Sequence, residues 1–409
     1  MNKSVKVNFL YLTLLQVINY VLPVVIIPFL IIKLGTEGFG IISFALATVT
    51  FFRVITSYGF DLTASREISI HREDKQKIAS VFSVVLLARA LLGIVCFILL
   101  LILIYIIPSI KDNAIVFLLT FLVVFGDILF PVWFFQGIED MKYITIFRVM
   151  YKLIYSILVV VFVDNPSDVI LVPLFDGLGS IISGMFSLVY IRSKFNVELI
   201  IPSISDIKDT YKKGYDVFLS KIMVVFYSSF NTFLLGVIVS PLIVGYYSVA
   251  ERVYLAVRGL LNPFIQAIFP YLSRLYLKDS DEYELVERKI TYKLFCVLVL
   301  LSICMYFSSD YLHLVLREEV SETTLMCLKI FSLTTVLAMG GYFSSLLITK
   351  GKGSRLRIIT TKTVIFNMII IYPLILYYEA IGAAICFLMV QLFHLALQIK
   401  ERRHDKKNS

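Results

Sequence analysis

The chain contains 409 residues, of which 59% are hydrophobic and only 16% are charged, and its formal net charge is +9. A water-soluble protein with so few charges and such long apolar runs would aggregate, so the composition excludes the soluble classes and indicates an integral membrane protein. The basic excess could suggest a nucleic-acid partner, but the position of the basic residues in loops explains it better, and no nucleic acid is expected.

Apolar runs separated by short polar breaks predict an all-α, polytopic membrane protein with 12 transmembrane helices. About 20 apolar residues are enough to cross the roughly 30 Å hydrocarbon core of a bilayer. The first half of the chain contains the runs 9–32, 39–60, 79–106, 114–136, 144–163 and 169–190. The second half contains the runs 215–239, 243–272, 291–309, 325–347, 358–377 and 380–398. The first run is too long for a signal-peptide core and is expected to stay in the mature protein.

The two sets of loops between these runs differ strongly in their content of lysine and arginine. Most of the 38 basic residues lie in one set, which includes both chain ends, whereas the opposite set holds only Lys33, Lys111 and Arg317. Basic loops are retained on the cytoplasmic side of a membrane. The sequence therefore predicts that both termini are cytoplasmic.

The two halves of the chain share a weak internal repeat. A shift of 205 residues aligns four identical residues of the second and eighth runs, namely Gly40, Ser43, Ala45 and Arg53 with Gly245, Ser248, Ala250 and Arg258. An even number of spans in each half makes both halves enter the membrane from the same side, so the repeats are parallel.

The repeat predicts two six-helix lobes around a central cavity. The amino-terminal lobe is expected at 1–200, a cytoplasmic hinge at 201–214, the carboxy-terminal lobe at 215–400 and a cytoplasmic tail at 401–409.

Arg53 is a cation inside the second apolar run. A guanidinium at the bilayer centre costs about 2.5–3.5 kcal/mol on insertion scales, so it should face protein or a water-filled cavity rather than lipid. At about 100° per residue, the small and polar residues of this run share about a third of the helix circumference. They are Ser43, Ala47, Thr50, Arg53, Ser57 and Asp61.

Three other runs carry a comparable polar face. The eighth presents Ser248, Glu251, Arg252, Arg258, Asn262 and Gln266, the seventh presents Lys221, Ser228, Asn231 and Thr232, and the first presents Gln16, Asn19 and Tyr20. Packing alone does not require such faces, so we predict a hydrated cavity shared by the two halves. Its candidate residues are the cations Arg53, Arg258, Arg252 and Lys221 and the polar residues Ser57, Asn262, Gln266 and Asn19. The alternative is a set of separate interhelical ion pairs.

Other charged residues within the runs have simpler explanations. Arg89 and Asp127 lie near mid-depth in neighbouring runs and are expected to form a structural ion pair, and Lys152 with Asp176 is a similar candidate. Arg148 lies about one turn from the end of its run and is expected to extend to the interface.

Glu251 and Asp61 are the candidates for proton or ion coupling. Glu251 precedes Arg258 by about two helical turns, so the two side chains share a face. A carboxylate there could neutralise an arginine in an empty cavity and release it to an anionic substrate. The alternative is a fixed Glu–Arg pair that only holds helices together.

The cysteines show no pattern of metal binding. All five, Cys96, Cys296, Cys304, Cys327 and Cys386, lie in apolar runs without ligand spacing, so they are expected to be buried and reduced. No metal, cofactor or catalytic residue is predicted.

Two segments resemble a known family. The first is PFLIIKLG at 28–35, followed by Gly38 and Gly40, and the second is PVWFFQG at 131–137, which continues into MKY at 141–143. With the chain length, the twelve runs and the GYYSVA opening of the eighth run, they resemble the Wzx-type O-antigen flippases. These form the polysaccharide-transporter branch of the multidrug/oligosaccharidyl-lipid/polysaccharide exporter superfamily. The chain departs from this family at Lys33, where arginine is common.

Three residues of the second segment are expected to be structural. Trp133 is interpreted as an interfacial anchor, and Gln136 and Gly137 as a tight turn at the cytoplasmic end of the fourth run.

The resemblance implies a transporter and not an enzyme. Members of this family move an undecaprenyl-pyrophosphate-linked oligosaccharide from the cytoplasmic to the outer leaflet of the bacterial inner membrane by alternating access. The implied partners are this lipid-linked unit of O-antigen or another surface polysaccharide, the lipid bilayer, and the polysaccharide polymerase and chain-length machinery. Guanidinium groups bind phosphate oxygens bidentately, which suits Arg53, Arg252 and Arg258 to the pyrophosphate, with Lys221 as a further cation.

Other functions make different demands on the sequence. A membrane enzyme such as a polymerase or glycosyltransferase would need paired carboxylates or a positioned base on an accessible loop, and the external loops are short. A multidrug exporter of the same superfamily would need an acidic cavity for cationic drugs. A scaffold without transport gives no reason for the repeated arginine.

Overall fold

The computed structural model describes residues 3–316 and 320–408, and helices account for nearly all of them. Side chains are described for these residues except at positions 3–17, 19–21, 24, 262–263, 266–267, 270, 280, 315–316 and 403–408. The chain divides into two compact units, Met1–Val225 and Phe226–Ser409, named unit 1 and unit 2 below.

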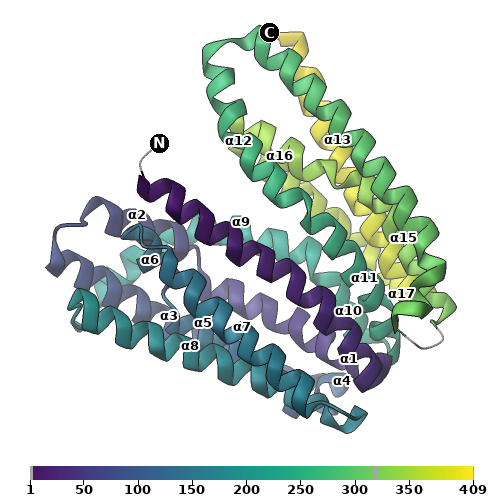
Figure 1. Ribbon diagram of the computed structural model, residues 1–409, viewed down its shortest axis with the longest axis horizontal. Helices are drawn as coiled ribbons and strands as arrows, with labels where there is room; N and C mark the ends of the chain where they lie inside the picture. Colours follow the sequence, from purple (N-terminus) through teal and green to yellow (C-terminus); the bar gives the residue numbers. More distant parts are fainter. Residues whose placement is uncertain (1–2, 317–319, 409) are drawn as a thin grey trace. The chain divides into compact units, whose positions relative to one another are not determined.

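Unit 1 is built from long helices joined by short breaks (Figure 1). Its elements are α1 (Lys3–Ser57), α2 (Phe60–Ile70), α3 (Lys75–Ile106), α4 (Pro108–Lys111), α5 (Ala114–Leu129), α6 (Val132–Gly137), α7 (Lys142–Phe162), the 3₁₀ helix η1 (Pro166–Ile170) and α8 (Leu171–Phe195). The helix α9 (Ile204–Ser228) contains the boundary between the units.

Unit 2 continues in the same manner. Its elements are α10 (Phe230–Ile238), α11 (Pro241–Gly259), α12 (Leu261–Lys278), α13 (Ser280–Ser308), the 3₁₀ helix η2 (Ser309–Tyr311), α14 (Leu312–Leu316), α15 (Glu322–Leu337), α16 (Met339–Thr349) and α17 (Gly353–Asn408).

Eight helical stretches of the described residues are long and apolar enough to cross a membrane, and the bent pair formed by α9 and α10 gives a ninth. The predicted all-α, polytopic fold is therefore confirmed, although the predicted spans do not correspond one to one with helices. The first predicted span and most of the second lie in α1, and the last two lie in α17. The span predicted at 243–272 falls on α11 and α12, and α11 carries three charged residues, Glu251, Arg252 and Arg258.

Both of the longest helices contain a backbone break. Gly35 interrupts α1 with φ 71° and ψ 169°, and Glu379 interrupts α17 with φ 49° and ψ −124°. Glycine has no Cβ and adopts positive φ without steric cost, whereas glutamate rarely does so. Both breaks lie in the short gaps that the sequence predicts between neighbouring spans.

The two halves of α17 fold back on each other at Glu379. Thr363 Oγ1 lies 3.1 Å from His394 Nδ1, and the rings of Phe366 and Phe393 stack with centroids 4.6 Å apart. Gly382 lies so close to the opposite half that a Cβ there would be 1.9 Å from the carbonyl oxygen of Leu374. The hairpin therefore depends on a small residue at this position.

Replacing Gly382 with valine is expected to destabilise the protein. The new side chain would collide with backbone atoms, which cannot rotate away, so the cost should be about 1–3 kcal/mol or more. The matched control is Gly353→Val, because a Cβ at Gly353 would have no neighbour within 4 Å. The measurement is thermal unfolding of the detergent-purified chain; equal melting temperatures for the two variants would contradict the tight hairpin.

Unit 1 packs around α5 and α8. Figure 1 shows α3, α5, α7 and α8 as neighbours, and α5 packs on α8, α3 on α5 and α7 on α8. Small residues allow the close approach of α5 and α8, because a Cβ at Gly126 would be 2.0 Å from Ser180 Oγ and one at Gly184 would be 2.7 Å from Leu129 Cβ. Close helix contact through small residues is the usual way to pack helices in a membrane.

Trp133 belongs to the core of unit 1 and not to its surface. It is fully buried, and its ring lies 5.6 Å from that of Phe82 in a cluster that also includes Phe134 and Phe135. The predicted interfacial anchor is therefore wrong. Pro131 separates α5 from α6 and starts a short helix that turns Trp133 inward. The tight packing of Gly137 is clear, since a Cβ there would be 2.7 Å from Ile68 Cβ.

The residues aligned by the internal repeat occupy similar environments in the two units. The aligned small residues are buried in both copies, namely Gly40, Ser43 and Ala45 on α1 and Gly245, Ser248 and Ala250 on α11. In unit 1, α1 packs on α5 and α5 on α8; in unit 2, α11 packs on α15 and α15 on α17. The packing partners of α1 and α11 thus follow a similar order in the two units.

The range expected as a hinge, 201–214, is largely helical and packs on unit 1. The hydroxyl of Tyr211 donates to the carbonyl of Ala88 at 2.8 Å, and Lys213 lies 3.3 Å from Glu67. A Cβ at Gly214 would be 2.7 Å from the carbonyl oxygen of Tyr58. The amino-terminal part of α9 therefore belongs structurally to unit 1.

Candidate functional site

Unit 1 contains a polar cavity of about 400 Å³. Its lining comes from α1, α2, α3, α5, α6 and α7 and the break before α6, namely Thr50, Arg53, Val54, Ser57, Asp61, Arg89, Asp127, Phe130, Val132, Gln136 and Arg148. Three arginines face two aspartates in this lining, so the cavity has an excess of positive charge.

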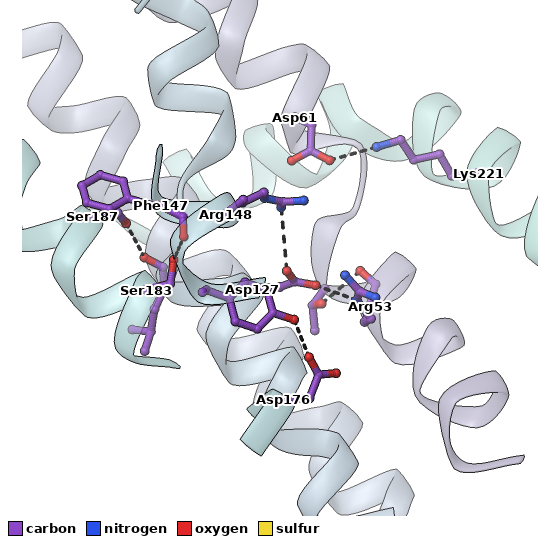
Figure 2. A network of polar contacts seen from close by, with 12 residues as sticks. Arg53, Asp61, Asp127, Phe147, Arg148, Asp176, Ser183, Ser187 and Lys221 are labelled. Carbon is purple, nitrogen blue, oxygen red and sulfur yellow. Dashed lines mark hydrogen bonds and ion pairs between the residues drawn. The ribbon is translucent and has the colours of Figure 1, made fainter. Parts of the chain in front are cut away.

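Arg53 is held in this cavity by Asp127. The Nε group of Arg53 donates to Asp127 Oδ2 (Figure 2). The two atoms are 2.6 Å apart, and the Arg53 side chain is 42% exposed. Its neighbours on the polar face do not bind it, because the hydroxyls of Thr50 and Ser57 donate to the backbone carbonyl oxygens of Leu46 and Val54. The rest of the Arg53 guanidinium can therefore reach a ligand in the cavity.

Asp127 on α5 binds two arginines at once. Its Oδ1 atom lies 3.9 Å from Arg148 Nη2, while Oδ2 accepts from Arg53 (Figure 2). The guanidinium of Arg148 also lies 5.4 Å from the ring of Phe130. The expected Arg89–Asp127 pair is therefore wrong, and Arg148 turns into the cavity instead of extending to the interface.

Asp61 reaches the cavity from a separate helix. The sequence predicted one continuous helix here, but α1 ends at Ser57. The next two residues, Tyr58 and Gly59, have positive φ angles of 42° and 78°, and α2 begins at Phe60. Gly59 is required here for space as well as for its backbone angle, because a Cβ would be 2.6 Å from Val217 Cβ.

The break brings Asp61 next to a lysine of α9. Lys221 Nζ lies 3.0 Å from Asp61 Oδ2 (Figure 2). Two of the residues predicted for the site, one as a cation and one as a coupling acid, therefore form an ion pair at the edge of the cavity.

Asp176 is bound by a tyrosine. The hydroxyl of Tyr151 on α7 donates a short hydrogen bond to Asp176 on α8 (Figure 2). Tyr151, which precedes Lys152 in the sequence, is therefore a partner of Asp176 that the sequence did not indicate.

Arg89 lines the same cavity although sequence reasoning assigned it a structural role. It lies near the middle of α3 and is only 4% exposed. The signal that could have identified it is its depth, because a mid-depth arginine without an acid on the same face needs a polar partner elsewhere.

Among the described residues of unit 2, no arginine forms an ion pair with Glu251. Thr232 Oγ1 on α10 lies 3.3 Å from Glu251 Oε2, and none of the described side chains forms an ion pair with Glu251. Beside it, the Nε group of Arg252 and the hydroxyl groups of Tyr247 and Ser248 are buried without a hydrogen-bond partner among the described residues. The expected alternative of a fixed Glu–Arg pair is therefore not supported.

The remaining predicted residues fall on parts of the chain described less fully. Arg258 is half-buried near the end of α11, and α11 stops at Gly259, so Asn262 and Gln266 lie on α12 and not on the same helix. The side chains of Asn262, Gln266 and Asn19 lie outside the described residues.

The cysteines are free, but not all of them are buried. Cys96, Cys327 and Cys386 are buried, whereas Cys296 and Cys304 are exposed on α13. The prediction of burial is wrong for these two, because α13 presents part of its apolar surface outward. Among the described residues, no group of three or more His, Cys, Asp or Glu side chains is arranged to hold a metal ion.

A cysteine at Ser57 is expected to react with a water-soluble maleimide, because Ser57 lines the polar cavity. The test replaces the five native cysteines first and compares Ser57→Cys with Ile98→Cys, which lies on the exposed apolar surface of α3. Only the Ser57 variant should be labelled in intact membranes. Equal labelling of both positions, or of neither, would contradict a hydrated cavity.

The chain matches a family model described as "Polysaccharide biosynthesis protein" over residues 5–276. Two curated relatives are named "Putative O-antigen transporter". That of Escherichia coli (strain K12) is 26% identical, covering 98% of this chain and 98% of the relative. That of Shigella dysenteriae is 28% identical, covering 97% of this chain and 99% of the relative.

Solved transporter structures are similar to the chain over most of its length. One is described as "Lipid II flippase MurJ, inward closed conformation", with a TM-score of 0.75, 13% identity and coverage of 97% of this chain and 87% of that chain. Another is the inward-facing conformation of a multidrug resistance MATE family transporter of the MOP superfamily, with a TM-score of 0.69, 15% identity and coverage of 95% and 99%. At these identities the likeness shows the fold alone.

Proposed function

Because the chain belongs to the polysaccharide biosynthesis protein family, we propose that it is a flippase for an undecaprenyl-pyrophosphate-linked oligosaccharide. The substrate is a repeat unit of O-antigen or another surface polysaccharide, and it moves from the cytoplasmic to the outer leaflet of the bacterial inner membrane by alternating access. Two full-length relatives bear the name of O-antigen transporters, and a lipid II flippase has a similar fold. The lipid tail stays in the bilayer while the head group crosses through the protein.

The arginine-lined cavity of unit 1 is the observation that carries this proposal. A pyrophosphate is too strongly charged to cross hydrocarbon unaided, so its path needs fixed cations. Arginine suits this task better than lysine, because its planar guanidinium forms two parallel hydrogen bonds to phosphate oxygens. Arg53 is assigned to the pyrophosphate, and Ser57 offers a hydroxyl for the sugars.

The cavity charge separates the proposal from its rivals. Cationic drugs would be repelled by a lining with more arginines than aspartates, which argues against a multidrug exporter. A polymerase or glycosyltransferase would need a positioned base, and both aspartates of the lining are held in ion pairs.

Unit 2 supplies the second set of proposed ligands. Arg258 is the repeat partner of Arg53, and Arg252 precedes it by less than two helical turns on α11. Lys221 is a further cation, which becomes available to the substrate when its ion pair with Asp61 breaks. Asn262, Gln266 and Asn19 are assigned to sugar hydroxyls.

The proposed architecture has twelve spans in two parallel six-helix lobes, 1–200 and 215–400, with both termini in the cytoplasm. The count follows if α1 and α17 are each two spans, as their breaks at Gly35 and Glu379 suggest, and if α11 with α12 is one more. Partners of the assembled pathway are the polysaccharide polymerase and the chain-length machinery.

Glu251 is the preferred coupling residue. Asp61 forms an ion pair with Lys221, whereas Glu251 accepts a hydrogen bond from the neutral side chain of Thr232. A proton or cation can therefore change the charge at Glu251 without first breaking an ion pair.

The function is tested by deleting the protein and identifying what accumulates. Cells without it should accumulate complete undecaprenyl-pyrophosphate-linked repeat units accessible only from the cytoplasmic face, and the wild-type chain should clear them. Incomplete repeat units would instead indicate a glycosyltransferase, and complete units exposed on the outer face would indicate a polymerase; either result would contradict the proposal.

A further inference from the structure

Arg89 is a buried cation that lines the cavity of unit 1 and has no carboxylate partner among the described residues. Its side chain is 4% exposed, its Nε group has no hydrogen-bond partner, and no ion pair among the described residues includes it. Among the described residues, no carboxylate therefore neutralises the Arg89 guanidinium by a direct ion pair.

The acids that could neutralise Arg89 are engaged by other cations. Asp127 holds Arg53 and Arg148 through its two oxygens, and Asp61 holds Lys221. Asp127 and Asp61 thus pair with three cations, and none of these ion pairs includes Arg89.

A purely structural role would leave this arrangement unexplained. Burying a guanidinium without a counter-charge destabilises a fold, because the lost hydration is not replaced by an ion pair. Arginines that only hold helices together inside a membrane pair with acids or backbone carbonyls. The unpaired Arg89 therefore points to a ligand that supplies the missing anion.

We propose that Arg89 is a binding residue for the second phosphate of a diphosphate, with Arg53 binding the first. This inference rests on the proposed function and names the residue that distinguishes a diphosphate from a monophosphate. The cavity of about 400 Å³ has room for roughly a dozen water molecules at about 30 Å³ each, and so for a diphosphate group.

Arg53 and Arg89 differ in whether the Nε group is hydrogen-bonded within the protein. Asp127 accepts from the Nε group of Arg53, and this hydrogen bond fixes the orientation of the guanidinium. The Nε group of Arg89 is free of such a bond, so this guanidinium can offer its donors to an incoming phosphate. Two separate cations in one cavity favour a ligand with two anionic groups over a ligand with one.

Binding is measured by equilibrium dialysis of the detergent-purified, full-length chain against radiolabelled inorganic pyrophosphate and, separately, orthophosphate. The variants are Arg89→Gln, Arg89→Lys and Arg53→Gln. The matched control is Arg192→Gln, which removes an exposed arginine of α8 that does not line the cavity. The wild type and the control should bind pyrophosphate more tightly than orthophosphate.

Arg89→Gln should weaken pyrophosphate binding about tenfold or more, as expected for a lost charge-assisted hydrogen bond, and should leave orthophosphate binding nearly unchanged. Arg89→Lys should recover part of the loss. Thermal stability should not fall in Arg89→Gln, because an unpaired buried charge has been removed. A lower melting temperature with unchanged pyrophosphate affinity would show a structural residue and overturn the inference.

The design separates this inference from the proposed function. If the wild type binds pyrophosphate and Arg53→Gln weakens it while Arg89→Gln does not, only the role of Arg89 is overturned. If the wild type binds no pyrophosphate, the proposed head-group recognition fails together with it. A parallel titration with farnesyl diphosphate tests whether the bound diphosphate is lipid-linked or free. Tighter binding of farnesyl diphosphate than of pyrophosphate supports a lipid-linked diphosphate, and weaker binding would contradict it.

Discussion

Arg53→Ala is expected to reduce export of surface polysaccharide to about a tenth of the wild-type level or less, because at least one charge-assisted hydrogen bond to the pyrophosphate is lost. Arg53→Lys should restore part of the export, since the charge survives and the bidentate fork does not. Arg258→Ala, the corresponding change in unit 2, should behave in the same way. The measurement is surface polysaccharide per cell, normalised to the amount of the protein in the membrane.

Protein abundance is the necessary control for this result. Arg53 is held by Asp127 at 2.6 Å, so its removal also changes an internal ion pair. Arg148 remains 3.9 Å from Asp127 and can compensate, which should keep the variant folded. Arg192→Ala serves as the matched substitution outside the cavity. Normal export by Arg53→Ala and Arg258→Ala at normal abundance would show that the head group does not use these cations.

Glu251→Gln is expected to abolish the dependence of export on the proton gradient while leaving substrate binding intact. Glutamine keeps the size of the side chain and can still accept from Thr232, but it cannot titrate. The variant should be produced at normal levels, because none of the described side chains forms an ion pair with Glu251 that the substitution would break.

The measurement compares export before and after addition of a protonophore. The wild type should lose export and Glu251→Gln should show a low, insensitive rate. Glu282→Gln, an exposed change in the first turn of α13, should behave like the wild type. Should Glu251→Gln export normally and remain sensitive to the protonophore, Glu251 is a structural residue.

The positions of the helices could be predicted from the sequence alone. Each predicted apolar run is helical over most of its length, because a segment that crosses a membrane must satisfy its backbone hydrogen bonds internally. Even the hairpin in α17 was marked by Glu379 and Gly382, a charged residue and a small one within an apolar stretch.

Breaks within the runs could not be predicted in this way. Tyr58 and Gly59 end α1 because Gly59 fits beneath Val217, a contact between segments far apart in the sequence. The sequence shows Pro131, but it does not show that the short helix after this proline turns Trp133 into the core. The hydropathy of the run alone would place Trp133 at a membrane surface.

Part of the lining of the unit 1 cavity could be predicted from the sequence. Helical periodicity correctly grouped Thr50, Arg53 and Ser57 on one face, because residues at intervals of three and four share a side of a helix. It could not choose the partner of Asp127, since Arg53, Arg89 and Arg148 come from three different helices. Only the packing of those helices decides that Arg53 and Arg148 reach the carboxylate and that Arg89 forms no ion pair with it among the described residues.

Transport by the purified chain in liposomes tests the central claim most directly. An undecaprenyl-pyrophosphate-linked oligosaccharide is placed in both leaflets, and a membrane-impermeant enzyme that cleaves the sugar from outside reports how much becomes accessible. With the wild-type chain nearly all of the substrate should become cleavable, whereas liposomes without protein or with the Arg53→Ala, Arg258→Ala double variant should stop at the outer-leaflet share. Equal cleavage in the wild-type and double-variant liposomes would contradict a flippase that carries its head group on these arginines.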